Sequence, residues 1–588
     1  MPLAAAVCAI VTILPSTASG SENEASKEPV QGRPLQYNLN MVHHNPGEKP
    51  FVTPYLDPAF LKEHGFNGYI PRVFMPCSIT YDEFDPTLMP AGSELRAQTE
   101  AYAKTIDEII RKAKAQGMPV YPFTDLLVVP QVLQAKYGKE MVAPDGKEYA
   151  GGEHASAVLG GSKLRASILQ PRTQEILRAQ WDGIFNRFPD LDGLTVRFGE
   201  TYLHEFPDYA GGSPIADAEG QIALIKLLRE EICVKRNKKV FFRTWDFENS
   251  RHPDYYLQFT NAVEPHPNLV FSVKNVAMDF LRMQAFHPCL GIGRHQQIVE
   301  ISCNPAGIGG KNAHPYYIGK GVIDGWEETS SIKHEGPAGN LRDMLKQPQF
   351  AGLWTWARGD GWAGPYTPNE MWVDINESVF SGFARNPALS EEELFNLAVH
   401  ARCGIDGDDL KKMRELCLLS ADAMVRGENS LVTETDGWWC RDQYLTAIDL
   451  EPVVKAGKTG EVLAEKAKAL EMWRHIEQLA REIHLPNPVD QKFLEVSCTY
   501  GRIKYSVMGE LWKMQLLAAQ AKVDQKPMDL EKLRAAIAAY DRSFDEWRAL
   551  RAANPESCAT LYHDEVTKFT TTLPFGPVLN TYRKMVVK

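Results

Sequence analysis

The middle of this chain alternates between two hydrophobic periodicities, and this alternation is the strongest constraint on its fold. Between about residues 35 and 362, runs rich in β-formers alternate with amphipathic helical patterns. In one helical pattern, residues 94–117, apolar residues such as Ile106, Ile110 and Ala113 recur at helical spacing. Eight strands with a helix after most of them predict a (β/α)8 TIM barrel. The strand-like runs are residues 37–44, 68–76, 118–129, 192–200, 239–246, 268–275, 296–302 and 350–360.

A doubly wound α/β sheet is the competing architecture. It usually carries a glycine-rich phosphate-binding turn after its first strand. No such turn follows residues 37–44. The pattern therefore favours the barrel.

The hydrophobic pattern of the sequence changes from alternating strands and helices to helices alone after about residue 386. Four long amphipathic helical patterns follow, at residues 389–403, 408–427, 459–483 and 528–553. We therefore predict a catalytic barrel over 35–385 and an all-α C-terminal domain over 386–588, which is also a candidate surface for a homodimer.

The N-terminal segment is typical of exported proteins. An apolar run from Leu3 to Leu14 precedes small residues suited to cleavage near Ala18, which predicts a signal peptide over 1–20 and a polar linker over 21–34. We expect a periplasmic or extracellular protein. No later segment approaches 18 uninterrupted apolar residues, so stable membrane insertion is not expected.

The net charge and the cysteine pattern argue against a nucleic-acid-binding protein and against a metal-binding protein. The net charge of −11 and the lack of a basic stripe argue against a nucleic-acid partner. No CxxC pattern or histidine ligand spacing is present, so we expect no metal site and no cofactor. The expected partner is an oligosaccharide or polysaccharide.

Polar residues gather where the predicted barrel strands end, and barrel active sites are built at these carboxyl ends. Three carboxylates and three cations fall on neighbouring strands, an arrangement suited to acid–base chemistry and anion capture. A structural alternative is that some of them only pair with each other, such as Arg197 with Asp246. The candidate catalytic residues are Glu200, Asp279 and Glu300, and the candidate substrate-binding residues are His43, Arg197, Arg243, Trp245, Lys274, Asn275, Arg358 and Asp360.

Glycoside hydrolysis fits this set of residues. The reaction needs one carboxylic acid to protonate the leaving oxygen and one carboxylate to act as nucleophile or base. Lysine and arginine side chains in the same pocket suit a substrate that carries its own carboxylate.

The stretch VKNVAMDFLRMQAFHPCLGIGRHQQIVEIS, residues 273–302, resembles the catalytic core of the glycoside hydrolase family 67 α-glucuronidases. Their pattern runs VKNGPIDFQPREPFHPLFG, followed by QMLEFQI about twenty residues after the aspartate. Residues 351–394 also resemble the family's passage from the last strand into its helical domain, and the resemblance spans roughly residues 190–400.

The resemblance implies an inverting mechanism, with Glu200 as the acid and Asp279 and Glu300 as the candidate bases. It also implies that Arg243 and Lys274 hold the carboxylate of a uronic acid. The family usually has a β-rich N-terminal domain, whereas the mature chain expected here begins almost directly with the barrel, and the context Gly199-Glu200-Thr201 also departs from the family. A barrel glycosidase acting on another sugar and a barrel that binds carbohydrate without cleaving it remain alternatives.

Overall fold

The computed structural model describes most of the chain beyond its N-terminal segment. The predicted signal peptide and nearly all of the linker lie outside the described part, and every structural statement below concerns that part. The described residues are 32–43, 52–142, 162–198, 201, 203, 205–245, 252–276, 285–303, 312–326, 336–358, 367–433, 448–559, 561 and 575–587.

Eight parallel strands form the main sheet, in the order β2-β1-β11-β10-β9-β8-β6-β3. Its two end strands also meet, because Tyr69 bridges Val120 and Arg72 bridges Phe123 in parallel register. The sheet therefore closes on itself, which confirms the predicted (β/α)8 barrel. The barrel strands are β1 (Tyr37–Val42), β2 (Gly68–Pro71), β3 (Phe123–Asp125), β6 (Gly193–Arg197), β8 (Lys239–Arg243), β9 (Leu269–Lys274), β10 (Gln296–Ser302) and β11 (Phe350–Arg358).

The interior of the barrel is filled by an apolar cluster. Side chains alternate between the two faces of a strand, so one residue in two points inward. The inward cluster is largely aromatic and aliphatic, and it packs separately from the larger core between barrel and helices. Its members are Tyr37, Leu39, Met41, Ile70, Tyr121, Phe123, Phe241, Val270, Val276, Ile298, Ala351, Trp354 and Trp356.

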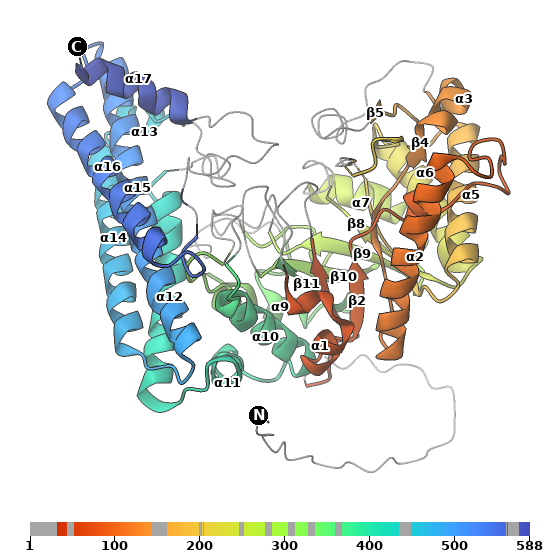
Figure 1. Ribbon diagram of the computed structural model, residues 1–588, viewed down its shortest axis with the longest axis horizontal. Coiled ribbons are helices and arrows are strands. Elements are labelled where there is room, and N and C mark those ends of the chain that lie inside the picture. The colour runs from red at the N-terminus through yellow and green to blue at the C-terminus, as the bar shows by residue number, and fades with distance from the viewer. Residues whose placement is uncertain are drawn as a thin grey trace.

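Helices surround the barrel (Figure 1). The longest of them, α2, starts at the cap Ser93, whose side chain accepts from the N–H of Arg96, and its apolar side packs into the core. The helices of this layer are α1 (Pro58–Glu63), α2 (Glu94–Ala115), α3 (Gln131–Met141), α5 (Pro171–Arg187), α6 (Ala218–Leu228) with a π-helical continuation (Arg229–Val234), α7 (Pro253–Asn261), α8 (Gly319–Asp324), α9 (Leu341–Met344) and α10 (Met371–Arg385).

A small second sheet was not expected from the sequence. The run 118–129 divides into β3 and a separate strand β4 (Val128–Pro130), because Leu127 adopts a positive φ of 54° between them. Strand β4 pairs with β7 (Tyr209–Gly211), which also pairs with β5 (Ser162–Lys163).

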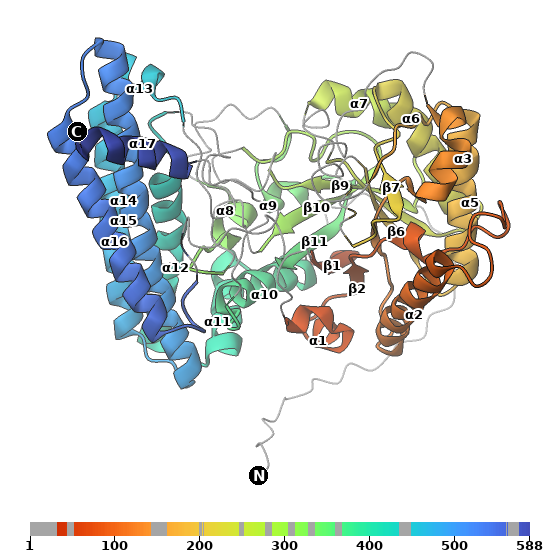
Figure 2. The same cartoon turned by 45° about the horizontal axis from the view of Figure 1, so that its top comes forward.

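A helical region lies beside the barrel, as expected from the sequence (Figure 1, Figure 2). Helix α11 begins with a capping box between Ser390 and Glu393. No helix among the described residues combines the length and apolarity needed to cross a membrane. The helices are α11 (Glu391–Cys403), α12 (Gly407–Glu428), α13 (Glu451–Lys455), α14 (Thr459–Glu482), α15 (Pro488–Asp524), α16 (Leu530–Ala553) and α17 (Phe575–Val587).

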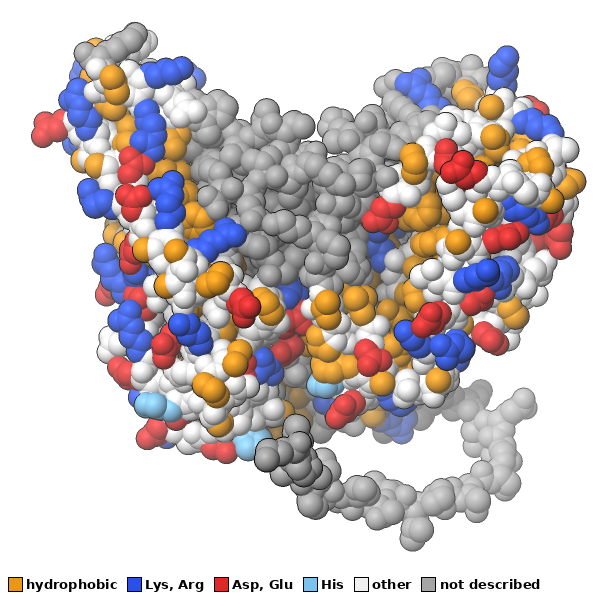
Figure 3. Space-filling view, viewed as in Figure 1, with side chains coloured by type: hydrophobic (Ala, Val, Ile, Leu, Met, Phe, Trp, Pro, Cys, Tyr) orange, Lys and Arg blue, Asp and Glu red, His pale blue; other side chains and the backbone are white. Residues whose placement is uncertain are grey.

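The described surface carries mixed charge. On the face shown in Figure 3, basic and acidic side chains are interspersed over both the barrel and the helical region. Many form short-range ion pairs, such as Arg96 with Asp82 and Lys513 with Glu510.

Candidate active site

A charged layer follows the apolar interior at the carboxyl ends of the strands. Each of its members lies two residues beyond an inward-facing residue, so strand alternation turns it toward the barrel axis. Ile298 thus precedes Glu300, and Phe241 precedes Arg243. By the same spacing the layer contains His43, Arg72, Asp125, Arg243 and Glu300, with Trp356 of the apolar cluster at the same level.

Arg243 and Glu300 form the central ion pair of this layer. Arg243 Nε donates to both carboxylate oxygens at 3.0 Å, and Nη2 donates to Oε1 at 2.7 Å. Ser272 Oγ, on β9 between them, donates to Oε2 at 3.3 Å. Arg243 and Glu300 are 2% and 0% exposed, so the two charges neutralise each other out of contact with water.

A second buried pair joins Arg197 to Asp125. Arg197 Nε donates to Oδ1 at 2.5 Å and Nη2 to Oδ2 at 2.9 Å, with both side chains 2% exposed. The suggested alternative partner of Arg197, Asp246, lies outside the described residues. Our sequence analysis did not single out Asp125, although its position two residues after the inward Phe123 marks it as a member of the layer.

Aromatic rings lie beneath the two guanidinium groups. The Phe123 ring centroid is 5.2 Å from Arg197 Cζ and 5.7 Å from Arg243 Cζ. Trp356 lies 5.0 Å from Arg243 Cζ. At these distances the guanidinium groups gain cation–π contacts with the rings.

His43 connects the first two strands. Its ring stacks on Trp356 at 5.2 Å with an interplanar angle of 10°. Arg72 Nε, at the end of β2, donates to His43 Nε2 at 3.2 Å, so this nitrogen acts as the acceptor. Arg72 was also missed by our sequence analysis.

Lys274, Trp245 and Asn275 lie on the adjoining strand ends. Lys274 Nζ is 3.8 Å from the centroid of the half-buried Trp245 ring. The backbone N–H of Asn275 donates to the Glu300 carbonyl at 2.9 Å, and its carbonyl accepts from His287 N–H at 2.8 Å. Asn275 Oδ1 is buried and accepts no hydrogen bond from the described residues.

Arg358 contacts the start of the next helix. Its Nε donates to Glu370, directly before α10, and its Nη2 donates to the Thr367 carbonyl at 3.0 Å. Arg358 is 1% exposed. This contact anchors the end of β11 to α10.

Three candidate residues lie outside the described part, namely Glu200, Asp279 and Asp360. Their strands are described, since β6 ends at Arg197, β9 at Lys274 and β11 at Arg358. The structure places Arg197, Arg243, Lys274, Asn275, Glu300 and His43 toward the carboxyl ends of their strands, with Trp245 beside them.

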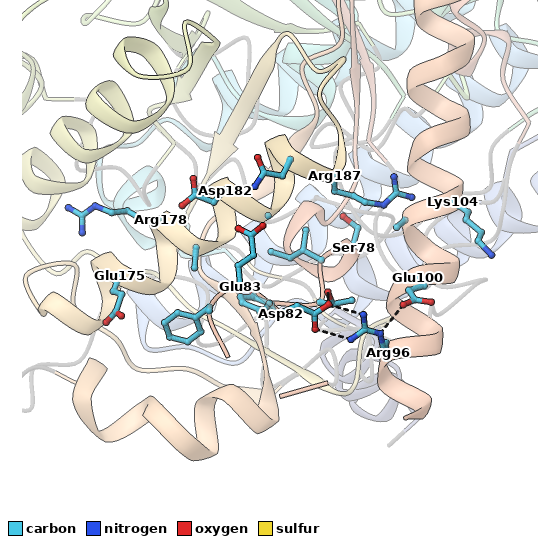
Figure 4. A pocket seen from close by; sticks show the side chains of 18 residues that line it. Ser78, Asp82, Glu83, Arg96, Glu100, Lys104, Glu175, Arg178, Asp182 and Arg187 are labelled. Atoms are coloured by element: carbon cyan, nitrogen blue, oxygen red, sulfur yellow. Dashed lines mark hydrogen bonds and ion pairs between the residues drawn. The ribbon is translucent and has the colours of Figure 1, made fainter. Parts of the chain in front are cut away.

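A separate hollow of about 810 Å³ lies on the outside of the barrel, between α2 and α5 (Figure 4). Arg96 from α2 bonds there to Asp82 at 2.7 Å and to Glu100 at 2.9 Å. The hollow lies away from the strand ends that carry the charged layer. Among the described residues, no cluster of three or more histidine, cysteine or acidic side chains is arranged to hold a metal ion.

Comparisons with known proteins support the fold. The sequence matches no protein-family model and no curated protein sequence. The structure is similar to a glycoside hydrolase family 138 enzyme that targets pectin rhamnogalacturonan II, with a TM-score of 0.57, 10% identity, and coverage of 95% of this chain and 83% of that one. A weaker likeness, with a TM-score of 0.39 and 11% identity, relates it to a mutant of Thermobaculum terrenum O-GlcNAc hydrolase over 88% of this chain and 95% of that one. At 10% identity, the likeness to the family 138 enzyme concerns the fold.

Proposed function

We propose that this protein is an exported glycoside hydrolase that cleaves a uronic-acid-containing saccharide of the α-glucuronoside, xylan type, with inversion at the anomeric carbon. The observation that carries the proposal is the charged layer at the carboxyl ends of a closed (β/α)8 barrel, where catalytic groups of such barrels lie. The resemblance of residues 273–302 to family 67 supports the acidic substrate. The shared fold with a pectin-targeting enzyme supports action on a polysaccharide.

The proposed roles follow the strand positions. Glu200, three residues beyond the end of β6, protonates the glycosidic oxygen. Asp279, five residues beyond β9, and Glu300, on β10, form the basic side of the site. Strand β8 lies between β6 and β9 in the sheet, and strands are about 4.8 Å apart. The strands that lead to the proposed acid and base are thus two spacings apart in the sheet, and a separation of that order between the carboxyl groups would favour inversion through a water held between them.

The acid role can be tested with Glu200→Gln. Acidic xylo-oligosaccharides and a panel of aryl glycosides are the substrates, and NMR of the first product anomer reports inversion or retention. We expect Glu200→Gln to lower turnover by at least about 10² on substrates with poor leaving groups. Glu100→Gln, on the outer side of α2, is the matched control and should retain wild-type rates.

Three outcomes would contradict the proposal. Binding of the oligosaccharides without release of reducing sugar would make the barrel a binding module. Wild-type rates in Glu200→Gln would remove Glu200 from the mechanism. A product with the anomeric configuration of the substrate would exclude inversion.

A further inference from the structure

The arginines at the carboxyl end of the barrel differ in how their charges are balanced. Three of them are each bound to a carboxylate, in the pairs Arg197–Asp125, Arg243–Glu300 and Arg358–Glu370. Arg72 is the exception among the described residues, because no carboxylate lies within ion-pairing distance of its guanidinium.

The hydrogen bonds of Arg72 leave one edge of its guanidinium open. Nε donates to His43 Nε2, and the group lies 5.2 Å above the Phe74 ring. Neither Nη1 nor Nη2 donates to a described residue, and Nη2 is buried. Two N–H-bearing nitrogens on one planar edge match the two oxygens of a carboxylate.

The position of this edge places it in the candidate site. Arg72 lies two residues after the inward-facing Ile70 and is bridged to Phe123, the ring beneath Arg197 and Arg243. His43 is held by stacking on Trp356, and it in turn fixes the Nε side of Arg72. The guanidinium is thus positioned before any ligand binds.

An anion is the ligand that this environment favours. Arg72 is half-buried, and its buried Nη2 donor costs free energy while no acceptor faces it. Burial, followed by the neighbouring charge of Arg197, lowers the pKa of Arg72, and Asp125 and Glu205 oppose this effect only in part. A ligand carboxylate on the Nη1–Nη2 edge would satisfy both donors and balance the charge.

We propose that Arg72 binds the carboxylate of the substrate, so that the end of β2 determines specificity for acidic sugars. This inference rests on the proposed function. It also changes the assignment implied by the family 67 resemblance, since both Arg243 donors that face Glu300 are already occupied by that side chain. Lys274 keeps its proposed role as a second contact to the substrate.

The test measures binding directly, by isothermal titration calorimetry of the full-length mature protein. The ligands are glucuronate and galacturonate, each with its neutral counterpart, glucose and galactose. The wild type should bind at least one acid more tightly than its neutral counterpart. Arg72→Gln should weaken binding of that acid at least about 30-fold, the equivalent of about 2 kcal/mol for a lost buried charge contact, and change binding of the neutral sugar less than about 3-fold.

Two further variants separate recognition from folding. Arg72→Lys keeps the positive charge without the planar edge, so its affinity for the acid should lie between those of the wild type and Arg72→Gln. Arg96→Gln removes an arginine from the outer side of the barrel and should bind like the wild type. Circular dichroism of each variant checks that the fold is retained.

The outcomes distinguish this inference from the proposed function. Equal losses for acidic and neutral sugars in Arg72→Gln, or a wild type without preference for either acid, would overturn the inference. If the wild type hydrolyses no glycoside but binds an acid in an Arg72-dependent way, the inference stands and the proposed hydrolysis fails. If the wild type hydrolyses glycosides and Arg72→Gln still prefers the acidic sugar, the proposed hydrolysis stands and the inference about Arg72 fails.

Discussion

The hydrogen bonds of the Glu300 carboxylate limit the part that this side chain can take in catalysis. Both of its oxygens accept from Arg243, and Oε2 also accepts from Ser272. A carboxylate has about four lone-pair positions, and these contacts occupy most of them. A general base needs an open position toward the attacking water. We therefore propose that Glu300 supplies fixed negative charge and that Asp279 removes the proton.

This assignment predicts different pH profiles for two variants, measured on an activated aryl glycoside. The acidic limb of the kcat/KM profile reports ionisation of the base. Asp279→Asn should remove this limb and lower the rate by at least about 10². Glu300→Gln should lower the rate but keep the limb. If Glu300→Gln loses the acidic limb of the profile and Asp279→Asn keeps it, Glu300 is the general base and Asp279 supplies the fixed negative charge.

The sequence predicted individual site residues better than their partners. Arg197 and Arg243 were found from their places at strand ends. Their partners Asp125 and Glu300 are 72 and 57 residues away, and only the pairing of distant strands in the sheet brings them together. Arg72 and Asp125 could have been identified by counting two residues on from an apolar inward position, had the inward face been known. Pairing also depends on the rotamers of long side chains, which no local pattern specifies.

At the scale of elements, the barrel strands could be predicted because each is an apolar run flanked by helical periodicity. All eight predicted runs contain an observed barrel strand. The three-stranded second sheet could not be predicted, because its strands are only two or three residues long. Strands this short carry no measurable periodicity.

The packing of α10 against the barrel contains a buried carboxyl group. Thr355 Oγ1, on the outer face of β11, donates to Glu377 Oε2 at 2.6 Å, and Asn40 Nδ2 on β1 donates to Thr355 Oγ1 at 3.0 Å. Glu377 is 1% exposed, and burial raises its pKa to about 8. The folded protein therefore holds a proton on Glu377 at neutral pH that the unfolded chain releases.

This proton makes stability depend on pH. The folded pKa exceeds the unfolded one, so the contribution is fully present below about pH 4.5 and is lost as pH rises toward about 8, at up to about 1.4 kcal/mol per pH unit. Glu377→Gln should remove this slope and be more stable than the wild type at pH 8. Urea unfolding of both proteins at pH 5, 6.5 and 8 measures the difference. Parallel profiles would show that Glu377 is ionised in the folded state.

At the scale of the whole molecule, the helical region holds a segment of the barrel. His314 precedes α8, in the part of the chain that follows β10. Its Nε2 accepts from Lys504 Nζ of α15 at 3.1 Å, and Lys504 also bonds to Glu428 of α12. Tyr505 OH donates to the same carboxylate at 3.1 Å. Burial, with the charge of Lys504, lowers the pKa of His314 well below its usual value, so the ring is a neutral acceptor.

Lys504→Met should therefore destabilise the protein by about 3–5 kcal/mol, because it removes the cation that the structure pairs with the fully buried Glu428. The double variant Lys504→Met/Glu428→Leu should recover most of this loss, since no uncompensated charge remains. Lys513→Met, on the same helix, removes an exposed pair with Glu510 and should cost less than about 1 kcal/mol. Denaturant midpoints of the four proteins, at equal concentration and pH, give the comparison. If Lys504→Met is no less stable than Lys513→Met, the buried contacts of Lys504 with Glu428 and His314 contribute no more to stability than the pair of Lys513 with Glu510.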